Sequence, residues 1–213
     1  MKILFGLVMF AWTVTLTAVE KKVTVVTDPA DSWPSNTRTI MEKAARLVFD
    51  RINDHDVAQC VYRHAFRENV EKVRRQWSSQ ITVLNKNPEV TLRVLKKKLD
   101  RSILGLAQLN KAQVEPEFFR IHQLEIILNE TNLNQFAEKY PAAAGDQELG
   151  IWVNTIAHEL AHNFGYKHGR SGVWVQDYPG YFPTELGFCV MTNGKYGSDL
   201  GDYELRRKFK DAR

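Results

Sequence analysis

The chain has 213 residues, of which 44% are apolar and 25% charged, and this balance is typical of one globular domain with a sizeable core. It excludes disordered, collagen-like and repeat-built proteins. The 29 Lys and Arg residues against 25 Asp and Glu give a net charge of +4, which is too small a surplus over this length to indicate a nucleic-acid partner.

The N-terminus has the pattern of a secretory signal peptide. Met1-Lys2 precedes an apolar run over residues 3–16, which small residues follow, and we expect cleavage near Ala18. Residues 1–18 are then removed, and residues 19–213 form a single exported domain. The apolar run is shorter than the ~20 residues that cross a bilayer, so we expect no membrane span, with an uncleaved anchor as the alternative.

The first elements expected after the signal peptide are a strand and a long helix. The β-branched run over residues 21–27 stops at Asp28-Pro29 and predicts the strand. Over residues 37–52 apolar side chains recur every three or four positions, which predicts an amphipathic helix. Residues 57–62 fit a strand or a helix, and residues 67–77 have helical spacing.

Four apolar segments follow in the middle of the chain. Residues 81–84 predict a short strand, whereas residues 90–99 satisfy both the strand and the helix pattern. Residues 102–107 predict an interior strand, and residues 118–128 predict a longer strand nearer an edge. The basic run Lys96-Lys97-Lys98 is interpreted as a solvated face.

The C-terminal third contains the most distinctive helix. Asn129 begins an Asn-Glu-Thr sequence, which is a possible glycosylation acceptor. A turn of small residues at 142–146 leads into a helix over residues 149–164, which Gly165 ends. A last helix is expected over residues 199–211.

The chain has two cysteines, Cys60 and Cys189. In an oxidising export compartment such a pair can form one disulfide, which we expect here. Two separate buried thiols are the alternative, because the sequence does not show that the two sulfur atoms meet.

The run His158-Glu159-Leu160-Ala161-His162 lies inside the helix expected over residues 149–164. Its two histidines are one turn apart on the same face, and Glu159 lies about 100° further round the helix. Gly165 can adopt the left-handed conformation that turns the chain, so His168 approaches the same point from a new direction. Three neutral imidazoles and a water complete a tetrahedral zinc site with one open position.

This five-position pattern is specific, because its odds of arising by chance in a chain of this length are on the order of 10⁻⁵ from average residue usage. The alternative is a pair of histidines on a polar helix face. The histidines at 55, 64 and 122 have no such spacing, and we interpret them as ordinary surface or packed residues.

The pattern resembles the metzincin clan of zinc endopeptidases, with Cys189-Val190-Met191-Thr192-Asn193-Gly194 as its methionine turn. The resemblance covers the motifs between Trp152 and Gly194 and is nearest to the reprolysin branch, which includes adamalysins. Gly169 stands where those enzymes usually carry Asp.

The resemblance implies an α+β catalytic domain with a twisted mixed sheet, a long backing helix, an active-site helix and a C-terminal helix. It also implies one zinc ion held by His158, His162 and His168. Met191 would pack beneath these imidazoles without binding the metal.

The implied reaction is peptide-bond hydrolysis by metal-activated water, with Glu159 as general base. The substrate would lie extended along the edge strand, which we place within residues 120–128. Aromatic residues before Met191 would wall an apolar pocket or pack in the core: Trp174, Tyr178, Tyr181, Phe182 and Phe188. We therefore expect a secreted, monomeric metalloendopeptidase that acts on protein or peptide substrates.

Three other interpretations are open at this point. A different zinc peptidase geometry would use Glu185 or Asp199 as an acidic third ligand. A secreted zinc-bound protein without activity, such as an effector or inhibitor, would keep the same scaffold, although the intact Glu159 argues against it. A cation-surface binder would depend on the cluster around Lys96.

Overall fold

The computed structural model describes residues 22–27, 33, 35–65, 69–86, 89–100, 105–107, 123–132, 145–166 and 180–196. In chain order these residues form β1 (Lys22–Thr27), α1 (Ser35–Arg51), α2 (His55–His64), α3 (Val70–Lys86), β2 (Glu89–Lys97), β3 (Gly105–Ala107), β4 (Gln123–Asn129), α5 (Gly145–Asn163) and α6 (Phe182–Met191). This mixture of helices and strands agrees with the expected α+β class in general.

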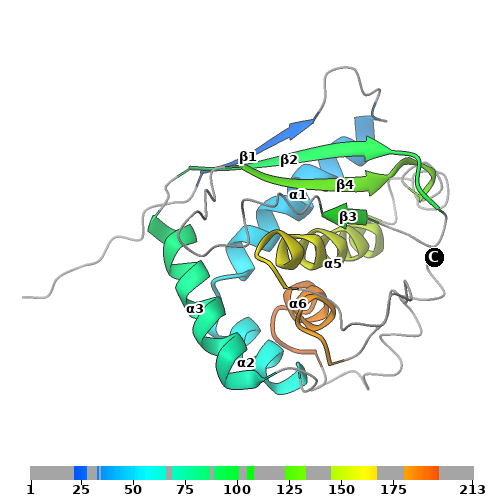
Figure 1. The fold of residues 1–213 in the computed structure, drawn as a ribbon. Coiled ribbons are helices and arrows are strands. Elements are labelled where there is room, and N and C mark those ends of the chain that lie inside the picture. Colours follow the sequence, from blue (N-terminus) through cyan, green and yellow to red (C-terminus); the bar gives the residue numbers. More distant parts are fainter. Residues whose placement is uncertain are drawn as a thin grey trace, which may run out of the picture.

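The strands form a four-stranded mixed sheet in the order β1-β2-β4-β3. β1, β2 and β4 are parallel, and β3 is antiparallel to β4. Figure 1 shows α1 and α5 below this sheet, with α6 beyond α5. Val90, Leu92 and Val94 of β2 are buried, whereas Glu89 before them and Arg93 among them are exposed. This alternation indicates that β2 packs on the helices with one face and meets solvent with the other.

The segment between α1 and β2 is more helical than expected. Residues 57–62, which fitted either pattern, belong to α2, and residues 90–97 belong to strand β2. The strand expected over residues 81–84 is wrong, because these residues continue α3. The buried residues of α3 are spaced by four, three and four positions, so the segment follows the helical period from its start: Val73, Trp77, Gln80 and Leu84.

The places of the last two strands are the reverse of those expected. Among the described strands β3 pairs only with β4, so it forms one edge of the sheet and β1 forms the other, whereas β4 pairs with β2 on one side and β3 on the other. This edge therefore lies at residues 105–107, and not within residues 120–128. A physical reason is that Ile126, Ile127 and Leu128 are all buried, as is typical of a strand covered on both faces.

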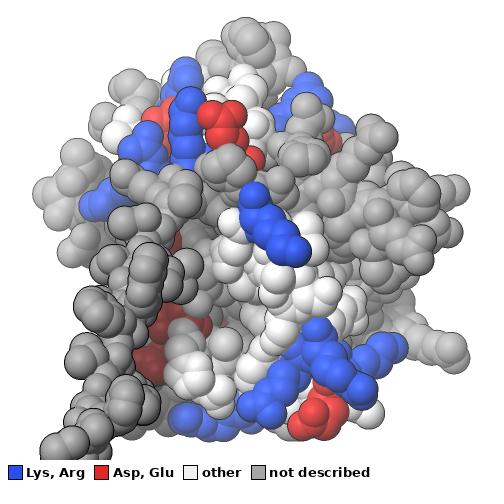
Figure 2. Space-filling model, turned by 90° about the vertical axis from the view of Figure 1, so that its left-hand side faces the viewer, with Lys and Arg blue, Asp and Glu red and all other residues white. Residues whose placement is uncertain are grey.

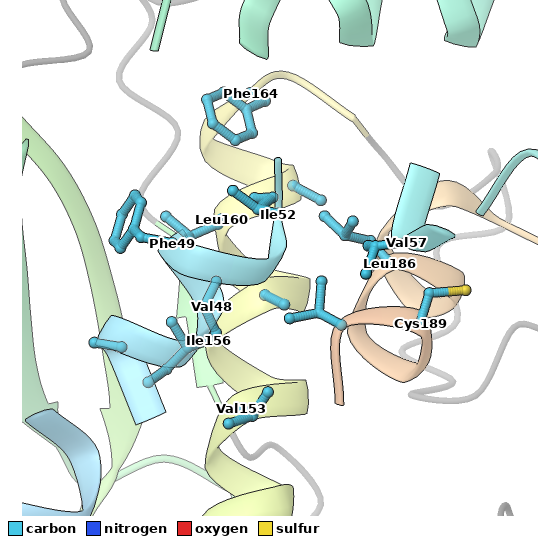
Figure 3. Packing of buried hydrophobic residues seen from close by; sticks show 14 of the residues in the cluster. Val48, Phe49, Ile52, Val57, Val153, Ile156, Leu160, Phe164, Leu186 and Cys189 are labelled. Atoms are coloured by element: carbon cyan, nitrogen blue, oxygen red, sulfur yellow. The ribbon is translucent and has the colours of Figure 1, made fainter. Parts of the chain in front are cut away.

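The core lies between α1, α5 and α6 (Figure 3). Val48 and Ile52 of α1 face Ile156 and Leu160 of α5, and Leu186 of α6 comes from the other side. All five side chains are at most 1% exposed. Complete burial of an aliphatic side chain contributes about 1.5–3 kcal/mol, so this layer fixes α5 firmly in the molecule.

The end of α6 is held from two other helices. Cys60 of α2 and Cys189 of α6 form a disulfide, as the sequence predicted. Arg51, at the end of α1, donates from Nη1 to the backbone oxygens of Val190 and Met191, at 3.1 Å each. A cation that caps the C-terminus of a helix also interacts favourably with its dipole.

Removal of the disulfide should lower the free energy of unfolding by about 2–5 kcal/mol, because the bond closes a long loop in the unfolded chain. The two cysteines are 129 residues apart in sequence. Urea unfolding of Cys60→Ala/Cys189→Ala and of the parent with and without reductant would measure the loss. Equal unfolding midpoints for the oxidised and reduced parent would contradict the prediction.

Charged side chains on the face shown in Figure 2 form separate groups, in which Lys and Arg stand beside acidic residues. The basic run at 96–98 is not a uniformly solvated face. The Lys96 side chain is only 7% exposed and pairs with Glu130 at 3.3 Å, and its nitrogen lies 5.6 Å from the centre of the Trp33 ring. This removes one cation from the surface cluster on which the cation-binder interpretation depends.

Asn129 has a structural role that does not fit glycosylation. The residue is 0% exposed, and its Nδ2 donates to the backbone oxygen of Asp100 at 2.7 Å. Its Oδ1 accepts from the backbone N–H groups of Leu99 and Thr131. A glycan would replace one of the two hydrogens on this buried nitrogen, so the described geometry disfavours glycosylation, which stays a prediction.

Some expectations fall on other parts of the chain. The signal peptide over residues 1–18 and the last helix over residues 199–211 lie outside the described residues. Among the helices that the structure describes, none combines the length and the apolar character needed to cross a membrane.

Candidate metal centre

The two histidines of the motif are the residues of α5 that solvent reaches within residues 151–164. We call the side of the helix on which they lie its accessible line. Between Ile151 and Phe164 every residue is buried except His158 and His162, which are partly exposed. The helix is apolar on nearly all sides because α1, α6 and the sheet surround it. Its accessible line is therefore made of two imidazoles one turn apart.

The separation of these imidazoles suits a shared tetrahedral ion. The ring centres of His158 and His162 are 5.0 Å apart, and the ring planes make an angle of 75°. With zinc–nitrogen bonds of about 2.0–2.1 Å, two imidazoles on one tetrahedral ion have ring centres about 5.2 Å apart. The separation of the two ring centres is therefore compatible with two ligands of one zinc ion.

His162 is held in the form that a metal needs. Its Nδ1 lies 2.7 Å from the backbone oxygen of Tyr166, so Nδ1 carries the proton and Nε2 is left to bind a metal. Burial lowers the pKa of His162, and the Tyr166 carbonyl opposes this shift only in part. The imidazole is therefore neutral near pH 7, which is the state that binds zinc.

The turn that ends α5 is the one that the sequence predicted. Gly165 has φ = +90°, in the left-handed region. The N–H of Tyr166 donates to Ala161 O at 3.1 Å, and the N–H of Gly165 donates to His162 O at 2.9 Å. These two bonds form a Schellman motif, which turns the Tyr166 carbonyl back toward His162. His168, the predicted third ligand, lies outside the described residues.

Aromatic packing fixes the Tyr166 backbone. The Tyr166 ring stacks on Phe182 with centres 3.9 Å apart, and Trp77 of α3 packs against Phe182 at 5.0 Å. Phe182 and Phe188 are 0% and 3% exposed, so both belong to the core and do not wall a substrate pocket. Tyr181 is only partly buried, and Trp174 and Tyr178 are among the residues not described.

Glu159 lies against the edge strand β3. The residue is 6% exposed, and the Ala107 backbone N–H donates to its carboxyl group. A Cβ at Gly105 would lie 3.2 Å from both Cγ and Oε1 of Glu159, so a larger residue there would push its neighbours aside by a few tenths of an ångström. Burial raises the pKa of Glu159 from 4.5 to about 8, and the Ala107 bond lowers it slightly in return.

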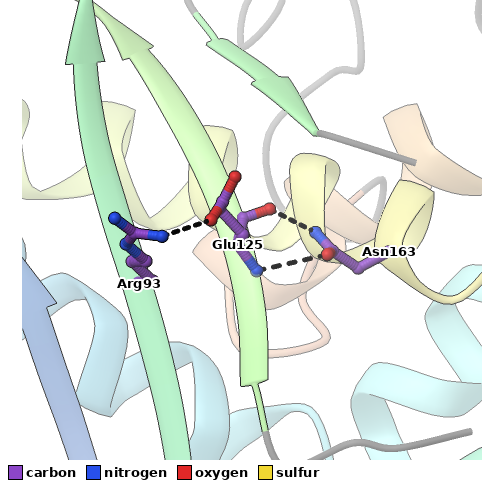
Figure 4. A network of polar contacts seen from close by, with 3 residues as sticks. All are labelled: Arg93, Glu125 and Asn163. Carbon is purple, nitrogen blue, oxygen red and sulfur yellow. Dashed lines mark hydrogen bonds and ion pairs between the residues drawn. The ribbon is translucent and has the colours of Figure 1, made fainter. Parts of the chain in front are cut away.

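Asn163 is a site residue that the sequence reasoning missed. It is 1% exposed, and its Oδ1 accepts from the Glu125 N–H at 3.3 Å (Figure 4). Its Nδ2 donates to the Glu125 oxygen at 2.9 Å and to the Glu159 backbone oxygen at 3.1 Å. The available signal was an amide at a position where the helix is otherwise apolar, because a buried amide needs partners.

Met191, the residue of the predicted methionine turn, is the last residue of helix α6. After Met191 the backbone passes through Asn193 (φ 52°) and Gly194 (φ 80°). The Met191 sulfur lies 3.7 Å from the position of a Cβ at Gly150. Gly150 is about 12 Å along α5 from His158, so this contact does not support packing beneath the imidazoles, which stays a prediction.

The alternative acidic ligand Glu185 has a partner of its own. It is 1% exposed in α6 and accepts from the Gly180 N–H at 2.6 Å. Asp199, the other alternative, lies outside the described residues. Within the described part of the chain, no three His, Cys, Asp or Glu side chains converge as a metal site, so the candidate ligands that the structure describes are His158 and His162.

Replacement of His168 by Ala should weaken zinc retention more than replacement of Tyr196 by Phe. A lost ligand should cost at least about 100-fold in affinity, because even the groups behind the ligands contribute 10–100-fold. Tyr196 is 1% exposed and its ring stacks on Phe188 at 5.1 Å, as a core residue does. The zinc content of each variant after dialysis against increasing concentrations of chelator measures its zinc retention. Weaker retention in Tyr196→Phe than in His168→Ala would contradict the ligand assignment.

Comparisons of this chain with protein-family models, with curated proteins and with solved structures find no match.

Proposed function

We propose that this chain is a secreted zinc-dependent endopeptidase of metzincin type. The observation that supports this most is the separation of 5.0 Å between the His158 and His162 rings, on the one accessible line of a buried helix. His168 is the proposed third ligand. The disulfide between Cys60 and Cys189 supports export, because such bonds persist in oxidising compartments.

Bound zinc supplies a Lewis acid that acidifies water and polarises a peptide carbonyl. His158 and His162 hold the ion through neutral nitrogens, and the Tyr166 carbonyl keeps His162 oriented. Glu159 takes the proton from the attacking water and passes it to the nitrogen of the leaving amine. The peptide C–N bond breaks without a covalent link to the protein.

The substrate would bind along β3. This strand is one edge of the described sheet, and its inner side already lies against Glu159. An extended peptide added to such an edge is held by main-chain hydrogen bonds, so the enzyme would read the substrate backbone more than its side chains. This favours an endopeptidase that acts on unstructured protein segments.

The test is cleavage of an unstructured protein by residues 19–213, purified after export. We expect cleavage with about one zinc per chain, loss of cleavage after chelation, and recovery when zinc is returned. A zinc-loaded, folded chain that cleaves nothing would overturn the proposal and favour an inactive zinc-bound binding protein. A chain that binds no zinc would overturn both.

A further inference from the structure

The side-chain amide of Asn163 hydrogen-bonds to the backbone of β4 at a point where a neighbouring strand would otherwise make these bonds. The N–H and C=O of one strand residue point to the same side, and Asn163 bonds both groups of Glu125. Ala107 of β3 pairs with Ile126, so Glu125 is the next position along β4 (Figure 4). The side chain thus continues the ladder of β4 by one step beyond the described end of β3.

The same amide also belongs to the active-site helix. Its Nδ2 donates to the Glu159 backbone oxygen, in the turn that carries Glu159 and His162. Glu159 in turn accepts from Ala107 of β3, and β3 pairs with β4. The active-site helix, the edge strand β3 and the inner strand β4 are therefore connected pairwise. Asn163 joins the helix to β4, Glu159 joins it to β3, and β3 pairs with β4.

We propose that Asn163 is a positioning residue that fixes the register between the active-site helix and the inner strand β4, and through the pairing of β3 with β4 the place of the edge strand. It holds Glu159 at a fixed place relative to a peptide bound along β3. The role rests on the proposed function, because register matters to catalysis only where β3 receives the substrate. A displacement of about 1 Å at a reacting group can cost 100-fold in rate.

The direct test compares Asn163→Leu with Asn154→Leu, a matched control on the same helix. Asn154 is 7% exposed, and its Nδ2 has no hydrogen bond within the described part of the chain. We expect Asn163→Leu alone to lower kcat per zinc-loaded molecule by about 10–100-fold. Zinc affinity should stay within about threefold of the parent, because both histidines remain on α5.

Two results of this comparison would overturn the proposal. One is a kcat for Asn163→Leu within about twofold of the control variant at a temperature where both are folded. The other is a fall in zinc affinity as large as the fall in kcat, which would make Asn163 a support of the ligands. If Asn163→Leu does not fold, Asn163→Asp replaces it, since it keeps an acceptor for the Glu125 N–H and loses both donor bonds.

Hydrogen exchange in the metal-free chain separates this proposal from the proposed function. The Ala107 amide, bonded to Glu159, should exchange at least about tenfold faster in Asn163→Leu than in the parent or in Asn154→Leu. The Val94 amide in the middle of the sheet should not change. A parent that cleaves no peptide would overturn the proposed function, while an unchanged Ala107 exchange would overturn the role of Asn163.

Discussion

Replacement of Glu159 by Gln should lower kcat/KM for peptide hydrolysis by about 10²–10⁴-fold and leave zinc in place. The amide has the size of the carboxyl group and can still accept from the Ala107 N–H, so β3 keeps its position. It cannot take a proton from water. Initial rates on a quenched fluorescent peptide, with zinc per chain measured on the same samples, separate chemistry from metal binding.

The control for this experiment is Glu71→Gln on α3, which changes the same group at an exposed position. It should behave like the parent in both rate and zinc content. Equal rates for Glu159→Gln and the parent would remove Glu159 from the mechanism. Loss of zinc from Glu159→Gln would instead show that the carboxyl group supports the metal site.

The local part of the site could be predicted because its signals lie close together in sequence. The spacing of His158 and His162 places both rings on one face of α5 whatever surrounds the helix. Gly165 ends the helix through backbone geometry that needs no distant partner. The disulfide was predicted from residue type and compartment, although only the fold shows that the two sulfur atoms meet.

The sheet edge could not be predicted because strand order depends on distant partners. The length of the segment around 118–128 favoured an edge, yet β4 is paired on both sides. The short β3 forms an edge instead, and its Gly105 lies against Glu159, more than 50 positions later in the sequence. The same limit applies to Asn163, whose partner Glu125 is 38 positions away.

The strand prediction for residues 81–84 was wrong for a different reason. Its β-branched residues favour a strand, but Trp77 and Leu84 lie seven positions apart on the buried face of one helix. Tertiary packing therefore overrides local propensity. Burial of Trp77 against Phe182 also connects α3 to the turn that orients His162, so α3 helps to hold this part of the candidate site in place.

The metal-free Glu159→Gln variant should be more stable than the metal-free parent at high pH. Burial raises the pKa of Glu159 from 4.5 to about 8, so the folded chain holds this proton more tightly than the unfolded chain does. The stabilisation is complete below pH 4.5 and is lost as the pH rises through 8. At 1.36 kcal/mol per pKa unit, the full loss is on the order of 5 kcal/mol.

Urea unfolding of both chains in chelator at pH 5, 7 and 9 measures this difference. The free energy of unfolding of the parent should fall relative to that of Glu159→Gln across the series, because Gln does not titrate. The lowered pKa of His162 acts in both chains and largely cancels. Bound zinc favours the charged carboxylate, so the difference should shrink in the zinc-loaded chains. A constant difference across the pH range would mean that Glu159 is charged in the fold even without metal.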